Sequence, residues 1–323
     1  MVEPKRFKSK KIMNNILLKL VFVMLVTTPA EEKQANILIN SIRDFGGRYA
    51  SSPVYVLTGD AINASCRTIT ASDVTLIPLE ISDSLPKYPF LLKVMACARA
   101  EELLQGKSEI MVWMDVDGLV LNEPGEFYLE KNKKIAIRPV NLRNNVGLPV
   151  DSPTDPYWQK IYDYTRLKLR KVPAVETLVD TQRVRLYLNS ATFSIRPEQR
   201  IFREWKRIFL LLLDDQEYQN NACLTDNHKI FLHQAVFSAV VASRIKENEI
   251  QWFSQKAGYP LHHHYELTQE KRVSKLNELE SVIYERLWDA PNWTMSTIKV
   301  DEPLKSWLKE KYENVTRREV YIQ

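Results

Sequence analysis

The chain has 323 residues, of which 45% are hydrophobic and 10% aromatic, a composition that excludes an intrinsically disordered protein and is sufficient for a large core. The net charge of +5 comes largely from basic residues near the N-terminus, so the body of the chain is nearly neutral. No arginine-rich stretch interleaved with aromatic residues is present, and we therefore expect no nucleic-acid partner.

Residues 1–15 are expected to form a basic, polar extension, which would suit a peripheral contact with anionic lipid. The apolar run over 16–26 resembles a signal peptide, and the protein would then be secreted or luminal. We favour a buried strand over 19–26, because Lys19 interrupts the run and its length is too short to span a bilayer. The three cysteines, Cys66, Cys97 and Cys223, form no disulfide framework, which favours a reducing compartment and a cytoplasmic location.

The first 117 residues alternate between predicted strands and helices. After the strand at 19–26, Thr28 is a predicted N-cap with Pro29 in the first turn of a helix over 30–44, which ends at Gly46-Gly47. Strands at 54–57 and 74–79, a helix at 88–105 and a strand at 109–117 follow. This alternation predicts a mixed, mostly parallel sheet with helices on both faces.

The second half of the chain is less regular. It contains predicted strands at 134–140 and 186–195, a loop at 141–156, helices at 156–168, 197–213 and 229–243, and an extended segment at 258–265. Helical periodicity occurs at 269–287 and 303–313. We expect a single α/β domain over 16–323, with a nucleotide-binding half (16–125), a half that completes the cleft (126–268) and C-terminal helices (269–323).

The apolar run that begins at Glu109 stops at two carboxylates, Asp115 and Asp117. In a strand, residues i and i+2 point to the same face, so both side chains are expected to converge at the carboxyl end of a central strand. Open α/β sheets bind ligands at that edge. Two carboxylates there suit a hard divalent cation that carries substrate phosphates. The competing interpretation is a strand that ends in an ordinary Asp-Gly turn, because the motif is short.

Four segments carry a family resemblance. They are residues 41–47 with 53–56, residues 112–117 with 120–124, residues 188–197, and residues 231–236 with 259–264. In this order they resemble nucleotide-sugar-dependent glycosyltransferases of the GT-A fold, in particular the glycogenin-like group and its uncharacterised bacterial relatives. The resemblance spans about residues 20–265. It implies transfer of a sugar from a nucleotide-diphosphate donor to a glycan, protein or lipid acceptor, with Mn²⁺ or Mg²⁺ as cofactor.

Two positions and one missing motif depart from the family pattern. Ala191 stands where the family usually has Gly, and His233 stands where it has an acidic residue. The Lys-Pro-Trp sequence that usually follows the metal-binding histidine is absent. These departures predict an altered sugar pocket, or a non-catalytic relative on the same scaffold.

The resemblance and the chemistry of the side chains together identify a metal site. Asp115 and Asp117 would hold the cation, which would neutralise the leaving nucleoside diphosphate. His262 or His264, which share one face of the expected extended segment, would add an imidazole, and imidazole suits Mn²⁺ better than Ca²⁺. The alternative for this histidine run is a solvated turn.

The same reasoning predicts the sugar and phosphate contacts. Asn189 and Gln234 are amides suited to sugar hydroxyls and are the predicted catalytic residues; buried, hydrogen-bonded polar groups are the alternative. Lys93 is expected to reach the donor phosphates or Asp115, unless it is an ordinary helix lysine whose charged end extends to solvent. Arg138 ends a strand near the cleft and would contact phosphate or form a structural salt bridge.

The nucleoside is expected beside the first two strands. Thr27 and Thr28 follow the first strand, where the family seats the nucleoside, although helix capping alone would also explain Thr28. Asp60 follows the second strand and completes the predicted donor-binding set.

A second enzyme class fits one motif. Residues 114–120 also resemble the first motif of haloacid-dehalogenase phosphatases, in which the first Asp is the nucleophile and the second an acid/base. That family has Thr where this chain has Leu119. The motif also normally opens the fold, whereas more than a hundred residues precede it here.

Overall fold

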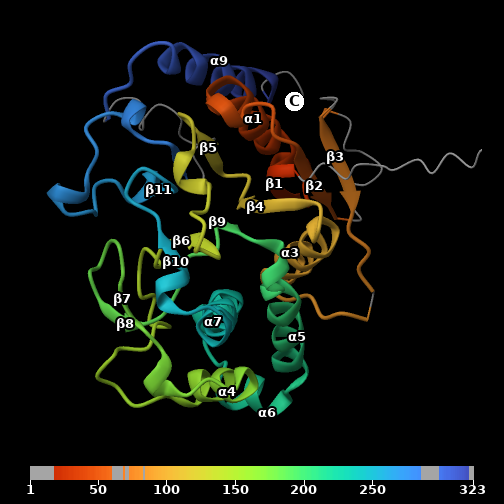
Figure 1. Ribbon diagram of the computed structural model, residues 1–323, viewed down its shortest axis with the longest axis vertical. Helices are drawn as coiled ribbons and strands as arrows, with labels where there is room; N and C mark the ends of the chain where they lie inside the picture. The colour runs from red at the N-terminus through yellow and green to blue at the C-terminus, as the bar shows by residue number, and fades with distance from the viewer. Residues whose placement is uncertain (1–17, 60–67, 70–72, 83, 285–297, 320–323) are drawn as a thin grey trace, which may run out of the picture.

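A seven-stranded sheet with the order β10-β6-β9-β4-β1-β2-β3 forms the centre of the computed structural model (Figure 1). The structure describes residues 18–59, 68–69, 73–82, 84–284 and 298–319. β9 is antiparallel to its neighbours β4 and β6, and the other neighbouring pairs are parallel. The predicted fold class, a mixed and mostly parallel sheet with helices on both faces, is confirmed.

The strands of this sheet are β1 (Leu18–Val26), β2 (Val54–Thr58), β3 (Val74–Pro78), β4 (Ser108–Met114), β6 (Ile135–Ile137), β9 (Thr192–Ile195) and β10 (Ile250–Trp252). The helices are α1 (Pro29–Phe45), α3 (Leu91–Leu104), α4 (Pro156–Thr165), α5 (Ile201–Asp214), α6 (Gln216–Asn221), α7 (Asp226–Arg244) and α9 (Leu304–Glu319). Smaller sheets join β11 (Tyr259–Pro260), β12 (Ser281–Ile283) and β5 (Gly118–Val120), and β7 (Ala174–Glu176) with β8 (Arg183–Arg185).

The central strands are apolar on both faces because helices cover both. In β1, Leu20 and Phe22 belong to the core under α1, whereas Val21 and Val23 belong to the core that α3, α5 and α7 share. A strand buried on both sides has no polar alternation, which explains why these strands read as continuous apolar runs. The N-cap prediction is also confirmed, since the Thr28 hydroxyl accepts a hydrogen bond from the Glu31 backbone N–H.

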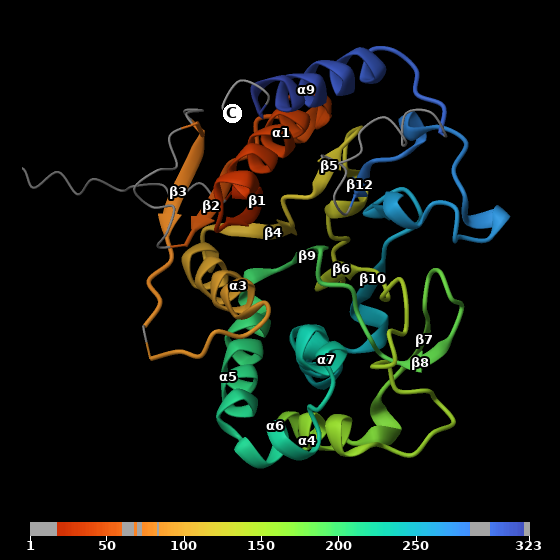
Figure 2. The ribbon, with the colours of Figure 1, turned by 180° about the vertical axis from the view of Figure 1, so that it is seen from behind.

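The C-terminal helix closes one side of the molecule. α9 lies beside α1 in both views (Figure 1, Figure 2), and the Trp307 indole donates a 2.6 Å hydrogen bond to Asp44. Leu304, Leu308 and Tyr312 pack into a core with residues of β5, β11 and β12. In the part of the chain that the structure describes, no helix has the length and apolar character needed to cross a membrane.

Four predicted elements need correction. The strand over 109–117 ends at Met114, and only Thr192–Ile195 of 186–195 forms a strand. The extended segment at 258–265 is a two-residue strand followed by a 3₁₀ turn, Leu261–His263. Within 269–284, short 3₁₀ turns and β12 replace the expected helix, because pairing with β5 and burial of Leu276 and Leu279 outweigh the local periodicity. The predicted basic extension, 1–15, lies outside the described residues.

Candidate active site at the carboxyl end of β4

An ion pair lies at the carboxyl end of β4. Lys93, in the first turn of α3, donates from Nζ to Oδ2 of Asp115 over 2.6 Å. Trp113 donates from Nε1 to the other carboxylate oxygen, Oδ1, over 2.8 Å. The Lys93 side chain is 6% exposed and that of Asp115 is 28% exposed, so the cation lies beneath a carboxylate that solvent still reaches. The prediction that Lys93 reaches Asp115 is confirmed.

Asp115 and Asp117 lie in a turn and not on a strand, which corrects the strand geometry expected for them. Because β4 ends at Met114, strand alternation does not extend to these residues, and they lie in the turn before β5. The Asp117 carbonyl accepts a 2.8 Å hydrogen bond from the Tyr284 backbone N–H. Burial raises the pKa of Tyr284 and of Tyr312, and the charge of Asp117 raises both further. Asp115 therefore faces α3, whereas Asp117 lies towards Tyr284 and Tyr312.

The segment 189–191 is joined directly to this turn. The Ala191 carbonyl accepts a 2.8 Å hydrogen bond from the Asp115 backbone N–H. The Asn189 side chain accepts from the Ala191 N–H over 2.8 Å, and Gln234 accepts from the Ser190 N–H over 3.1 Å. Asn189 remains half-buried, while Gln234 is buried and supports the backbone of the segment. The structure thus places both predicted catalytic amides beside Asp115, with Asn189 the more accessible.

His233 occupies the position at which the sequence resemblance implies an acidic residue. Its Nε2 lies 3.1 Å from the Ser190 hydroxyl, and its ring stacks on Phe90 with centroids 4.1 Å apart. Burial, and to a smaller extent the charge of Lys93, lowers the pKa of His233 well below its usual range. The imidazole is therefore neutral, and the departure replaces a carboxylate with an uncharged ring near Lys93 and Ser190.

The predicted histidine ligands lie on a turn rather than on one strand face, which corrects the geometry expected for them. His264 is buried, and its Nδ1 lies 2.6 Å from the Tyr259 hydroxyl. His262 is half-buried and its ring lies 4.3 Å from that of His263. β11 leads into this turn and pairs with β12, which pairs with β5 directly after Asp117. The sheet therefore brings the turn and the Asp117 segment to one edge.

The candidate ligands have the right chemistry for a divalent cation, but they do not form a complete metal site made by protein side chains alone. Among the residues that the structure describes, no three His, Cys, Asp or Glu side chains are grouped closely enough to hold a metal ion. Each oxygen of Asp115 accepts one of these two hydrogen bonds and has a second lone pair, so this carboxylate can still coordinate a cation. A cation here would need oxygens from elsewhere, which a bound diphosphate can supply.

Thr27 and Thr28 lie at the carboxyl end of β1, next to β4 in the sheet. The side-chain hydroxyl and the backbone N–H of Thr27 donate to the Glu31 carboxylate, over 2.7 and 2.6 Å, and Thr28 caps α1. These contacts order the edge, while the exposed Thr28 remains accessible to a ligand. Asp60, the other residue predicted to contact the nucleoside, lies outside the described residues.

Arg138 is used inside the fold, contrary to the predicted phosphate contact. It is buried and donates to the backbone carbonyls of Gly258 and Ser254, the latter over 3.1 Å. Burial lowers its pKa to about 10, which leaves it charged at neutral pH. Arg138 therefore holds the 254–258 segment against the end of β6 through hydrogen bonds to backbone carbonyls. The roles expected for it were a phosphate contact or a structural salt bridge.

Sequence reasoning missed two aromatic residues of the site. Trp113 orients Asp115, and its position near the end of β4, two residues before Asp115, was a usable signal. Phe90 precedes α3 with φ +58°, is 44% exposed, and covers His233 while its ring lies 5.9 Å from the Lys93 ammonium. No sequence pattern indicated Phe90, because its partner His233 is more than a hundred residues away.

A family model described as the Rhodobacterales glycosyltransferase domain matches residues 22–244. No curated protein matches the chain in sequence.

Several solved structures are similar at low identity. WbbM, a bifunctional glycosyltransferase in its apo form, is 12% identical with a TM-score of 0.45 over 91% of this chain and 51% of its own. Apo GlyE from Streptococcus pneumoniae TIGR4 is 10% identical with a TM-score of 0.49 over 92% and 64%. The galactosyltransferase LgtC, in complex with donor and acceptor sugar analogs, is 11% identical with a TM-score of 0.45 over 89% and 99%. The chain thus spans about half of WbbM and less than two thirds of GlyE.

Proposed function

This chain belongs to the Rhodobacterales glycosyltransferase domain family, and from that premise we propose that it transfers a sugar from a nucleotide-diphosphate donor bound at the carboxyl end of β4. The observation that carries the proposal is the Lys93–Asp115 ion pair at the carboxyl end of β4, in which Asp115 is partly exposed. A diphosphate ligand bound at such an edge needs a cationic side chain to contact its phosphates and a carboxylate to hold its metal ion.

The roles of the side chains follow from their positions. Lys93, near the N-terminus of α3, places a fixed positive charge where a leaving diphosphate would carry negative charge, and the helix dipole has the same sign there. Asn189 is half-buried beside Asp115 and offers amide donors to a sugar hydroxyl. Gln234 accepts from the Ser190 backbone N–H and His233 contacts the Ser190 hydroxyl, so both hold Ser190 and thereby position Asn189.

The proposal includes Mn²⁺ or Mg²⁺, with Asp115 and Asp117 as the residues that would hold it and His264 or His262 as an additional ligand. When bound, such an ion neutralises developing charge on the leaving nucleoside diphosphate. Cations of this kind are commonly held by one or two carboxylates together with substrate phosphates, so the donor itself would complete the site.

The family match decides against the phosphatase alternative. The sequence agrees, since Leu119 stands where the phosphatase motif has Thr and more than a hundred residues precede the motif.

A thermal-shift screen of nucleotide sugars and nucleoside diphosphates, with Mn²⁺ and with a chelator, tests the proposal. A ligand at 100 times its dissociation constant stabilises the fold by about 2.7 kcal/mol. We expect this shift only with Mn²⁺, and we expect Asp115→Asn or Asp117→Asn to abolish it. Asp214→Asn is the matched control, because Asp214 is an exposed carboxylate at the end of α5. Metal-independent binding, or no nucleotide binding by the parent protein, would contradict the proposal.

A further inference from the structure

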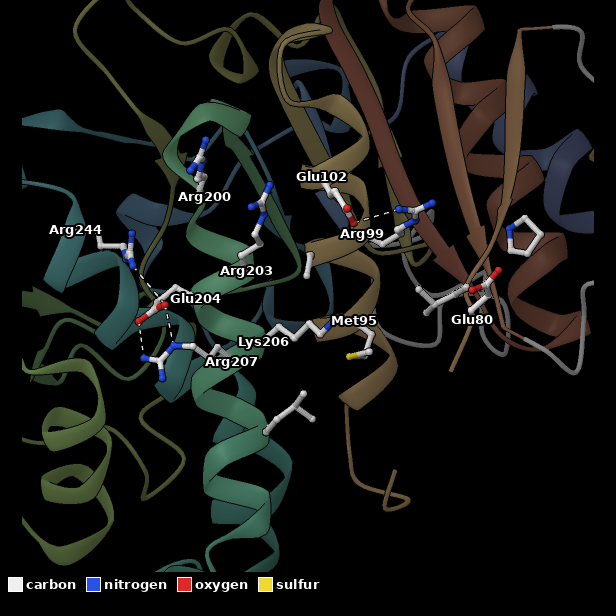
Figure 3. A pocket seen from close by; sticks show the side chains of 14 residues that line it. Glu80, Met95, Arg99, Glu102, Arg200, Arg203, Glu204, Lys206, Arg207 and Arg244 are labelled. Carbon is white, nitrogen blue, oxygen red and sulfur yellow. Dashed lines mark hydrogen bonds and ion pairs between the residues drawn. The ribbon is translucent and has the colours of Figure 1, made fainter. Parts of the chain in front are cut away.

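A hollow of about 930 Å³ lies on the outer side of the helical layer, between α3 and α5 (Figure 3). The end of β3 and the last residue of α7 form its margins. Met95 and Arg99 line it from α3, whereas Lys93 on the same helix turns inward to Asp115. The hollow is therefore separate from the candidate active site.

The lining of this hollow is strongly basic. Six of its side chains are cationic and three are carboxylates, an excess of three positive charges on a protein whose body is otherwise nearly neutral. The cations are Arg99, Arg200, Arg203, Lys206, Arg207 and Arg244.

The carboxylates leave several cations without a counter-charge. Arg207 donates twice to Glu204, over 2.8 and 3.0 Å, and Arg244 shares the same carboxylate at 3.3 Å. Arg203 donates to the neutral amide oxygen of Gln105 over 2.9 Å. Arg200 and Lys206 make no ion pair within the described part of the chain, and Figure 3 shows both beside α5 without a dashed contact.

These cations are arranged rather than scattered. Arg203 and Arg207 lie one turn apart on one face of α5, since residues four apart are neighbours on a helix, and Arg200 is the residue directly before this helix. Like charges at that spacing destabilise a helix, and an anion between them relieves the repulsion. Glu204 and Gln105 also hold three of the guanidinium groups in place, so less side-chain entropy is lost when a ligand binds.

We propose that this hollow binds a ligand that carries two or more phosphate groups. Guanidinium groups match phosphate oxygens with paired hydrogen bonds, and arginine predominates among the cations here. Met95, Ala98 and Leu210 provide an apolar part of the lining for the organic portion of such a ligand. A free organic polyphosphate and a phosphorylated lipid headgroup share this chemistry, and the hollow is concave, which suits a single molecule rather than a flat surface.

Binding of inorganic tripolyphosphate to the full chain, measured by calorimetry in buffer freed of divalent metals, tests this site apart from the metal-dependent donor site. The test variant combines Arg200→Gln, Arg203→Gln and Lys206→Gln. The control combines Lys168→Gln, Arg170→Gln and Lys171→Gln, which removes the same charge from an exposed turn elsewhere. We expect the test variant to weaken binding by at least about tenfold and the control to change it little.

A second arm compares phosphatidylcholine vesicles with and without cardiolipin, a lipid whose headgroup carries two phosphates. Vesicle binding that needs cardiolipin and is lost in the test variant assigns the phosphates to a lipid, whereas tripolyphosphate binding alone assigns them to a soluble ligand. Binding to neither probe, or an equal loss in the test and control variants, would overturn the proposal. Asp115→Asn should leave tripolyphosphate binding unchanged, so failure of the donor-site proposal and failure of this one are distinguishable.

Discussion

Lys93 and Asp115 form a 2.6 Å ion pair in which the cation is more deeply buried than the anion. The Lys93 ammonium lies 5.9 Å from the rings of both Phe90 and Trp113, so two aromatic rings form part of its surroundings. Because an ammonium in such surroundings depends on its counter-charge, the two residues should be energetically coupled.

Asp115→Asn should lower the free energy of unfolding by about 2 kcal/mol, less than the 3–5 kcal/mol typical of a broken, fully buried pair, because Asp115 is 28% exposed. Lys93→Met should cost only about 1 kcal/mol, since it removes the buried charge and keeps the volume. Urea denaturation measures both. The double variant should lose less unfolding free energy than the two single variants lose together. A loss equal to the sum of the two single losses would contradict the coupling.

Glu101 makes stability depend on pH. It is fully buried on α3 and accepts hydrogen bonds from the Phe202 and Arg203 backbone N–H groups, over 3.1 and 3.0 Å. Burial raises its pKa from 4.5 to about 7, although these hydrogen bonds oppose the rise. The folded state therefore binds the proton more tightly than the unfolded state does. The resulting stabilisation is complete below pH 4.5 and is lost as the pH rises to about 7.

The rise in pKa corresponds to about 3 kcal/mol of stability lost by the parent protein between pH 4.5 and 7. Gln at position 101 cannot titrate, so Glu101→Gln should not lose this stability. As the pH rises over this range, the unfolding free energy of the parent should therefore fall relative to that of the variant. Urea denaturation at pH 5 and pH 7.5 measures the shift. A difference that is the same at both pH values would show that Glu101 does not titrate in this range.

Tyr259 should strengthen metal binding by accepting a hydrogen bond from His264. If His264 binds the cation through Nε2, its Nδ1 carries the proton and donates to the Tyr259 hydroxyl, 2.6 Å away. Tyr259→Phe should then weaken Mn²⁺-dependent nucleotide binding by about tenfold, and His262→Ala with His264→Ala should weaken it further. His263→Ala is the control, because His263 pairs with Glu266. Unchanged Mn²⁺ affinity in the double variant would make the histidine run structural.

Trp307 fastens α9 to α1 through its hydrogen bond to Asp44 and its edge-to-face contact with Phe45, at 5.3 Å between centroids. Trp307→Ala should destabilise the protein by about 2 kcal/mol, below the cost for a fully buried tryptophan, because Trp307 is half-buried. Trp307→Phe keeps the ring contact and should cost about half as much. Hydrogen exchange should show faster opening of α9 in Trp307→Ala, and unchanged exchange there would contradict this fastening role.

Gly47 and Gly106 provide a matched pair for backbone strain. Both have positive φ, +55° and +72°, but a Cβ on Gly47 would lie 2.7 Å from the Glu123 Cβ, whereas a Cβ on Gly106 would meet nothing within 4 Å. Gly106→Ala should cost about 1 kcal/mol for its backbone conformation alone. Gly47→Ala should cost roughly 2 kcal/mol or more, because it also displaces Glu123 from Arg48. Equal losses in thermal or urea unfolding would refute the steric contribution.

Local chemistry allowed much of the first half of the fold to be predicted. The strands at 19–26 and 54–57 and the helix start at Thr28 depend on apolar runs and a cap, which act within a few residues of the chain. The segment around Asp115 was recognisable for the same reason, and the family match confirms that it belongs to a glycosyltransferase.

Long-range contacts decided the rest. Asp115 and Asp117 lie in a turn and not on a strand, because the strand ends at Met114 and β12, from far along the chain, pairs with β5 directly after Asp117. The same sheet places His262 and His264 on a turn, and burial against carbonyls of residues 254–258 removes Arg138 from the edge. The sequence by itself determined which side chains are available to the site. Only the tertiary structure decided which of them meet, because pairing and burial are energies between segments that local pattern does not contain.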